Sequence, residues 1–233
     1  MIVPKLNIAK AWAEKGRCYV RWTPDSSQLL QTAKVILNGL LRSQLSQHCF
    51  HVKAHGGMKH CILQTQDCCE KFRFVARFDV ENYYESMSHD VLLQQATEAG
   101  LSAWHIALLE SYLRIPDRSA SGMDLTAGGA LSPLLAALYL TPLDRAMEVE
   151  MRRHDVRYMR YMDDFVIFAQ TRFHLRRAIK IVHQVLSKLN LRVHPLKRFI
   201  GLTKKGFDFL GYRFNPDQGL DIAAKTTTKM LVR

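Results

Sequence analysis

The sequence predicts an α+β fold in which helices cover one face of an antiparallel sheet. Three observations carry this prediction. Alternating apolar residues mark a strand that ends at Asp79. Two short apolar runs on either side of Asp163 and Asp164 mark a hairpin. Apolar residues at helical spacing recur between and after these strands, an order that is typical of an α+β domain.

The N-terminal part contains one clear helical pattern. Apolar residues recur every three or four positions over residues 28–45, and the polar residues 25–27 before them are typical of a helix start. Residues 17–22 have the character of a strand. Residues 49–60 are predicted to form a loop.

The segment from residue 72 onward carries the main sheet pattern. Phe72, Phe74, Ala76 and Phe78 alternate strictly and lead into Asp79. Helices are predicted over residues 88–99, 102–113 and 132–153, with a small-residue loop at 122–129. A strand pair is predicted over residues 158–169, an amphipathic helix over 175–189 and a short hairpin over 207–214. The helix also has a basic face: Arg172, Arg176, Arg177 and Lys180.

The chain of 233 residues is strongly basic, with a net charge of +12. Such a surplus favours a polyanionic partner, nucleic acid or an anionic membrane face, over a generic basic protein. No apolar run reaches the ~18 residues that span a bilayer, and the first residues lack a signal-peptide pattern. The five cysteines show no C-x-x-C spacing, which favours a reduced, cytoplasmic setting.

Histidines and cysteines between residues 48 and 61 raise the alternative of a zinc site. They are His48, Cys49, His51, His55, His60 and Cys61. Their spacing does not match a structural zinc site, so loop histidines that face nucleic acid are the better interpretation.

Asp79 and Asp163 are candidate ligands of catalytic metal ions. Nucleotidyl transfer needs two divalent cations about 3.5–4 Å apart, one activating a 3′-hydroxyl and one holding the triphosphate. Mg²⁺ prefers a few carboxylate oxygens, with positions left for water and phosphate. Either aspartate alone is more often part of an ordinary turn or strand end, so the prediction depends on the motifs around them.

Five segments, in order, resemble the motifs of reverse transcriptases. They are Phe-Asp-Val-Glu-Asn-Tyr-Tyr at 78–84, Gly-Gly-Ala-Leu-Ser-Pro-Leu-Leu-Ala at 128–136, Tyr-Met-Asp-Asp at 161–164, residues 191–197, and Phe-Leu-Gly-Tyr at 209–212. Arg160, immediately before the third motif, resembles the arginine that bacterial members of the group II intron and retron type often have there. The resemblance implies a right-hand polymerase palm with a ferredoxin-like antiparallel sheet, helices on one face, and reduced fingers.

The same resemblance implies a division of the chain. Residues 1–71 would be a fingers-like N-terminal part and residues 72–214 the palm. Residues 215–233 would be a short C-terminal tail, with a thumb not evident.

The resemblance also implies two Mg²⁺ ions, with Mn²⁺ as a substitute. Asp79, Asp163 and the Val80 carbonyl would be ligands. Asp164 would be a supporting carboxylate, with direct ligation left open. Lys197 would act as general acid near the leaving pyrophosphate, although a surface lysine is the plainer interpretation.

Other positions match residues that contact the nucleotide. Tyr84 stands where the family carries an aromatic steric gate against a 2′-hydroxyl. Gly128 and Gly129 would let the backbone approach the nascent base pair. The residue before them departs from the family, because Ala127 replaces a Gln that touches the incoming nucleotide.

Two further groups of residues have implied contacts with substrate. Arg17 and Arg21 are candidates to neutralise the triphosphate, and Leu210, Gly211 and Tyr212 would form a primer grip.

These motifs together imply RNA-templated DNA synthesis on a DNA or RNA primer from deoxynucleoside triphosphates. A second subunit, a second copy or a structured RNA would replace the thumb, and no membrane is involved. One alternative is a polymerase-like nucleic-acid-binding subunit with weak or lost activity, which Ala127 and the missing thumb favour. Another is an RNA-templated RNA polymerase, against which Tyr84 argues. A retroelement and antiviral defence are both compatible settings.

Overall fold

The structure is a computed structural model that describes residues 5–14, 17–117, 121–217 and 219–223. It divides into two compact units, each assembled from separate stretches of the chain. The helical unit comprises Met1–Ser46, Asn82–Thr141 and Leu189–Leu191, and the sheet unit comprises Gln47–Glu81, Pro142–Lys188 and Arg192–Arg233. The predicted division at residue 71 stays a prediction.

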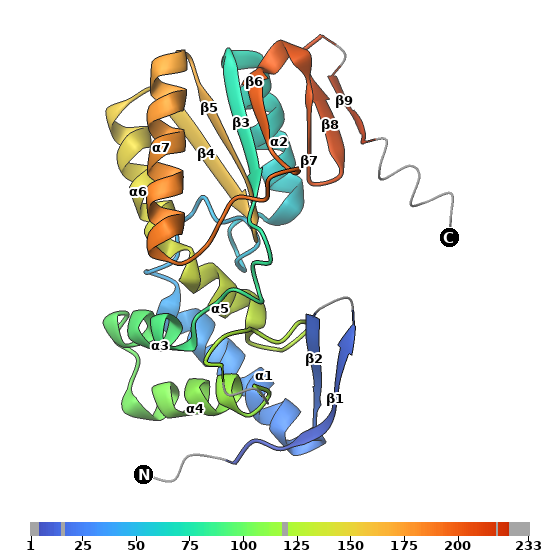
Figure 1. Cartoon of the computed structure of the whole chain (residues 1–233), viewed down its shortest axis with the longest axis vertical. Coiled ribbons are helices and arrows are strands. Elements are labelled where there is room, and N and C mark those ends of the chain that lie inside the picture. The colour runs from blue at the N-terminus through green and yellow to red at the C-terminus, as the bar shows by residue number, and fades with distance from the viewer. Residues whose placement is uncertain (1–4, 15–16, 118–120, 218, 224–233) are drawn as a thin grey trace. The chain divides into compact units, whose positions relative to one another are not determined.

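The helical unit combines one hairpin with four helices (Figure 1). The hairpin pairs β1 (Ile8–Glu14) with β2 (Arg17–Trp22), and the helices are α1 (Pro24–Leu41), α3 (His89–Glu98), α4 (Ala103–Arg114) and α5 (Ser132–Tyr139). Helix α3 begins after Ser88, whose hydroxyl accepts a hydrogen bond from the Val91 N–H. Inside the unit the rings of Trp22 and Tyr112 stack with their centroids 5.6 Å apart.

The sheet unit is built on four antiparallel strands in the order β4-β5-β3-β6. Their bounds are β3 (Phe74–Asp79), β4 (Val156–Tyr161), β5 (Asp164–Ala169) and β6 (Phe199–Leu202). Its helices are α2 (Gly57–Lys71), α6 (Thr141–Arg153) and α7 (Arg172–Lys188), and a 3₁₀ turn, η1, spans Thr203–Lys205. A second sheet contains β7 (Phe207–Phe209), β8 (Tyr212–Asn215) and β9 (Gly219–Ile222).

Helices lie on both faces of the four-stranded sheet (Figure 1). Side chains alternate along β3, so Phe78 contacts the ring of His183 on α7, whereas Val75 joins an apolar cluster with Cys61 on α2. The predicted α+β class and antiparallel sheet are confirmed. Helix α7 covers one face of the sheet, as predicted. Helix α2 covers the other face, which was not predicted.

Two local predictions were wrong. The predicted loop at residues 49–60 ends at Gly56, because α2 already begins at Gly57. The predicted long helix over residues 132–153 is two helices, α5 and α6, separated at Leu140. Pro142 explains the break, since proline has no N–H to continue the hydrogen bonds of α5 but is tolerated in the first turn of a helix, where it stands in α6.

All five cysteines lie in the described part of the chain, and none forms a disulfide. None of the helices described is both long and apolar enough to cross a membrane.

Candidate active site

Three carboxylates gather where β3 ends beside the β4–β5 hairpin. Asp79, the last residue of β3, is the cross-strand partner of Asp164, the first residue of β5. Asp163 lies in the two-residue turn between Tyr161 and Asp164. The N–H of Val80 donates to the carbonyl of Asp163 at 3.2 Å, so the end of β3 is tied to the tip of the hairpin. The sequence prediction that these aspartates meet is therefore reproduced by the strand register.

Two basic side chains, Lys197 and Arg77, form ion pairs with two of these carboxylates. The Lys197 Nζ lies 3.2 Å from Oδ1 and 3.5 Å from Oδ2 of Asp79. The guanidinium of Arg77 donates to Oδ1 of Asp164 at 2.5 Å. Lys197 was expected at this site. Arg77 was not expected, because it lies between the apolar positions of the alternating pattern that predicted β3.

Burial raises the pKa of Asp164 to about 6, although Arg77 lowers it. The charges of Asp79 and Asp163 contribute to this rise in the pKa. Together, the three carboxylates carry more negative charge than Lys197 and Arg77 neutralise. That excess is the electrostatic condition that a bound divalent cation relieves.

The donor set fits a hard divalent cation in its chemistry, because three carboxylates converge on two adjacent strand ends. Within the described ranges, no group of three or more His, Cys, Asp or Glu side chains is arranged to hold a metal ion. Instead, Lys197 forms an ion pair with Asp79, and Arg77 forms one with Asp164. Asp79, Asp163 and Asp164 are the residues that would hold the metal once those cations yield.

A buried ion pair supports the hairpin tip. The side chains of Arg160 and Asp144 are 0% and 1% exposed, and Arg160 donates Nε–H to Oδ1 at 2.8 Å and a second N–H to Oδ2 at 2.5 Å. The Tyr158 hydroxyl also donates to Asp144. The third guanidinium nitrogen of Arg160 donates to the carbonyl of Met162 at 2.9 Å. The pair therefore reaches the turn that carries Asp163.

His51 holds the same turn from the other side. Its Nδ1 accepts a hydrogen bond from the Met162 N–H at 3.0 Å. Met162 adopts φ 59°, a left-handed conformation that non-glycine residues rarely take. With its N–H and its carbonyl both bound, this strained residue is fixed in place.

The loop that carries His51 pairs with β4 through a bridge between Cys49 and Arg160. Burial raises the pKa of the Cys49 and Cys61 thiols to about 12, so both are neutral thiols packed in the interior. His55 is also buried, with Nδ1 3.1 Å from the carbonyl of Cys49. Sequence reasoning took these histidines for residues facing nucleic acid and missed the part of His51 in supporting the turn.

The residues predicted to select the nucleotide lie in the helical unit. Tyr83 is buried and donates its hydroxyl to the Ala136 carbonyl, while Tyr84 is partly exposed. Of the two tyrosines, Tyr84 is thus the one whose ring is accessible to a ligand. Arg21 is exposed, and the side chain of Arg17 lies outside the described part.

Gly128 and Gly129 of the second motif are glycines for different structural reasons. Gly128 takes φ 72° with open space around its α-carbon. A Cβ at Gly129 would lie 2.0 Å from the hydroxyl of Tyr112, so close packing excludes a side chain there. Before them, Ala127 is buried and its N–H donates to the Cys18 carbonyl at 2.8 Å, which attaches this loop to β2.

The predicted primer-grip residues form the β7–β8 turn. Phe209 pairs with Tyr212, which leaves Leu210 and Gly211 as the two turn residues. Both have positive φ, 50° and 85°, as a type I′ turn requires. The predicted hairpin is confirmed in the structure, and its role in gripping a primer stays a prediction.

A family model described as "Reverse transcriptase (RNA-dependent DNA polymerase)" matches residues 22–214. The chain belongs to the reverse transcriptase family. This match includes all three aspartates and both partner cations. The bacterial subgroup within the family stays a prediction.

Solved telomerase structures share this reverse transcriptase fold at low sequence identity. Apo telomerase from Candida tropicalis matches with a TM-score of 0.63 and 12% identity over 94% of this chain and 50% of that one. The same telomerase truncated from its C-terminal domain gives 0.61 and 13% over 84% and 45%. Telomerase from Candida albicans, in complex with a TWJ fragment of telomeric RNA, gives 0.62 and 13% over 85% and 37%.

This reverse transcriptase chain therefore spans half or less of the length of those structures. No curated protein matches it.

Proposed function

We propose that the protein is an RNA-templated DNA polymerase that adds deoxynucleotides to a primer 3′-hydroxyl by two-metal nucleotidyl transfer. The observation that carries the proposal is the register of β3 and β5. It makes Asp79 and Asp164 direct neighbours and places Asp163 in the turn tied to Val80. Membership of the reverse transcriptase family supports the reaction class.

Each residue of the carboxylate cluster has a distinct part in the proposal. Asp79, Asp163 and the Val80 carbonyl hold two Mg²⁺ ions, and Asp164 completes the negative charge. Bound Mg²⁺ supplies Lewis-acid activation of the hydroxyl and charge neutralisation at the triphosphate. Lys197, whose Nζ lies 3.2 Å from Asp79, would donate a proton to the leaving pyrophosphate.

The choice of deoxynucleotides rests on Tyr84. Its ring is partly exposed, while the ring of Tyr83 beside it is buried. An aromatic ring against the sugar excludes a 2′-hydroxyl by steric contact. The partners that follow from the reaction are an RNA template, a primer and deoxynucleoside triphosphates. The RNA in the Candida albicans structure supports an RNA partner.

One observation favours a second candidate, a nucleic-acid-binding subunit with weak or lost activity. Ala127 is buried and engaged with β2, so no side chain at this position reaches a nucleotide as a Gln would. The retained cluster of Asp79, Asp163 and Asp164 argues for the active enzyme, because a binding subunit has no need of it.

Primer extension tests the proposal. Purified protein with Mg²⁺, an RNA template, an annealed primer and labelled deoxynucleotides is expected to lengthen the primer, and Asp163→Asn is expected to abolish the product. A wild-type protein that binds the primer–template without extending it supports the binding subunit instead. Extension with ribonucleotides alone supports the RNA polymerase.

Selection by Tyr84 needs its own comparison. Tyr84→Ala is expected to admit ribonucleotides, while Tyr84→Phe, which keeps the ring, should discriminate as the wild type does. The ratio of kcat/KM for the two sugar types measures the effect. Unchanged discrimination in Tyr84→Ala would show that the gate is another residue.

A further inference from the structure

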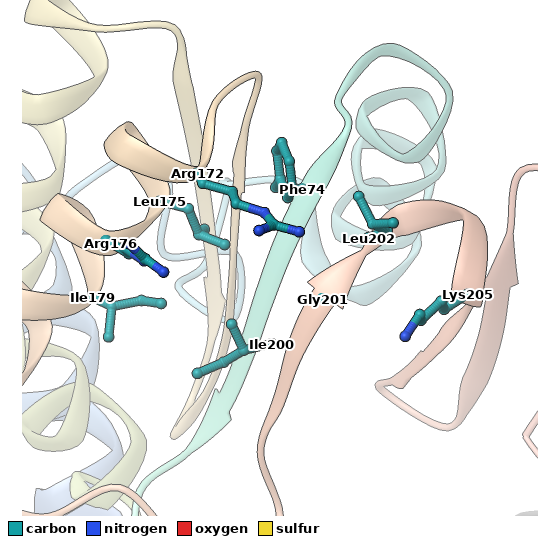
Figure 2. Close-up of a pocket in the computed structure, with 9 residues that line it drawn as sticks. All are labelled: Phe74, Arg172, Leu175, Arg176, Ile179, Ile200, Gly201, Leu202 and Lys205. Atoms are coloured by element: carbon teal, nitrogen blue, oxygen red, sulfur yellow. The ribbon is translucent and has the colours of Figure 1, made fainter.

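A second surface of the sheet unit has the features of a binding groove. It lies between α7 and the edge strand β6 and has a volume of about 280 Å³ (Figure 2). Its floor is apolar, with Leu175 and Ile179 from α7 and Ile200 from β6. Helix α7 packs on β5 and β3, so β6 projects beyond its cover and Ile200 is 51% exposed.

The groove is separate from the carboxylate cluster. Phe74 lines the groove at the start of β3, and Asp79 is at the other end of the strand. Five residues of extended chain span about 17 Å, and the alternation of side chains puts these two on opposite faces.

The rim of the groove is exclusively basic. Arg172 and Arg176 project from α7 and Lys205 from η1, and Figure 2 shows their charged ends directed toward the space between them. No carboxylate lines the groove. Among the described residues, none of these three cations takes part in an ion pair.

Two arginine side chains lie over the ring of Phe74, which lines the groove. The guanidinium carbons of Arg73 and Arg172 lie 5.4 and 5.7 Å from the centroid of Phe74. Guanidinium groups also bind phosphate bidentately and stack on planar bases.

We infer that this groove binds a single-stranded segment of RNA outside the catalytic centre. Phosphates contact Arg172, Arg176 and Lys205, and one base or ribose lies over Ile179 and Ile200. The cavity has room for one such group, and its basic rim beside an apolar floor matches a phosphate linked to a base or ribose. This binding goes beyond polymerisation, because it holds RNA away from the carboxylates and needs no chemistry.

Binding of a labelled single-stranded RNA in EDTA, followed by fluorescence anisotropy, tests the inference without catalysis. The variant Arg172→Gln/Arg176→Gln/Lys205→Gln removes the rim charges. Its affinity should fall tenfold or more, and the slope of log K against log salt should decrease by about 2, from ~0.7 per phosphate contact. The matched control, Lys53→Gln/Lys59→Gln/Lys188→Gln, removes three exposed charges elsewhere. Equal weakening in both variants would overturn the inference.

A second variant tests the apolar floor. Ile200→Asp places a carboxylate there and should reduce RNA affinity comparably, whereas Leu63→Asp, at a similarly exposed position on α2, should not. Melting temperatures confirm that both variants fold. Wild-type RNA affinity in Ile200→Asp would exclude the floor from binding and overturn the inference.

Two further arms separate this inference from its rivals. Phosphatidylserine vesicles that bind wild type but not the rim variant, with RNA binding equal in both, would assign the groove to a membrane instead. Primer extension on a short saturating primer–template should proceed at the same rate in wild type and the rim variant. If wild type extends no primer but still binds RNA through the groove, the polymerase proposal fails and this inference stands.

Discussion

The β4–β5 and β7–β8 hairpins each have a two-residue turn that begins with a strained residue, but they hold it by different means. Each turn has two residues, and the first of them is a non-glycine residue at positive φ, Met162 at 59° and Leu210 at 50°. Such a conformation costs about 1–2 kcal/mol in an L-residue. Both hairpins therefore need something to offset this strain.

At the β4–β5 tip the support is polar and buried. Arg160 and His51 bind the carbonyl and the N–H of Met162, and Asp144 neutralises Arg160. At the β7–β8 tip Leu210 and Tyr212 pack on the apolar cluster of the sheet unit, and one backbone hydrogen bond, from the Ala223 N–H to the Gly211 carbonyl at 3.0 Å, holds the second turn residue. The first arrangement fixes the direction of the turn that carries Asp163. The second packs its turn against the core of the sheet unit.

Breaking the buried ion pair should have the largest effect. Arg160→Met leaves the carboxylate of Asp144 buried without its partner, and the free energy of unfolding should fall by about 3–5 kcal/mol. Urea denaturation measures the loss.

A matched variant separates stability from positioning. Asp144→Leu/Tyr158→Phe/Arg160→Met replaces the whole polar group by apolar side chains and should recover most of the stability. It should not recover primer extension, because the Met162 carbonyl still lacks its donor. Full activity in this triple variant would show that the ion pair serves the fold alone.

Neutralising Asp164 should have the next largest effect, in the opposite direction. Burial and the neighbouring carboxylates raise its pKa to about 6, so above pH 6 the charged form destabilises the metal-free fold. The penalty fades as the pH falls from 6 toward the unfolded value near 4. Asp164→Asn should therefore stabilise the protein at pH 7.5 by at most about 3 kcal/mol, from 1.36 kcal/mol per pKa unit.

Thermal melts at pH 7.5 and 4.5, with EDTA and with Mg²⁺, measure that gain. The advantage of Asp164→Asn should shrink at the lower pH, and Mg²⁺ should stabilise the wild type more than the variant, which lacks one of the three negative charges. A gain independent of pH would contradict the role of the charge.

Removing the acceptor at His51 should have a smaller effect. His51→Phe leaves the Met162 N–H without its partner, which costs about 1–2 kcal/mol. His51→Asn keeps an acceptor oxygen and is the control. Chemical denaturation and the kcat of primer extension should both distinguish the two, and equal values would indicate that water replaces the imidazole.

The smallest effect is expected at the β7–β8 turn. Leu210→Asn exchanges apolar packing for a residue that tolerates the left-handed conformation, so stability should change by less than about 1 kcal/mol. Its kcat should remain at the wild-type level. A large loss of kcat with normal stability would show that this turn contacts the primer.

The sequence predicted the strands of the site because their patterns are local. Alternation identified β3, and two apolar runs around Asp163 and Asp164 identified the β4–β5 hairpin. Pro142 was a visible signal for the break between α5 and α6. By contrast, the start of α2 at Gly57 follows from packing against β4 and β5, which lie about a hundred residues away.

The supporting side chains of the site were harder to predict for the same reason. No local sequence signal distinguishes Asp144 from other helix aspartates, because only the fold brings it to Arg160. Arg77 lies between two apolar residues of β3, and nothing local in the sequence marks it as part of the site. Its partner Asp164 is identified only by the strand register. Local pattern thus predicts the carboxylates, and three-dimensional pairing reveals what holds them.

Single-nucleotide addition tests the central claim most directly. The rate of the first deoxynucleotide addition to a primer on an RNA template, with Mg²⁺, is compared between wild type and Asp163→Asn at matched fold stability. The account predicts Mg²⁺-dependent addition by wild type and a loss of about a hundredfold to a thousandfold in the variant, the range for removing a charge-stabilising group. Equal rates in the two proteins would contradict it.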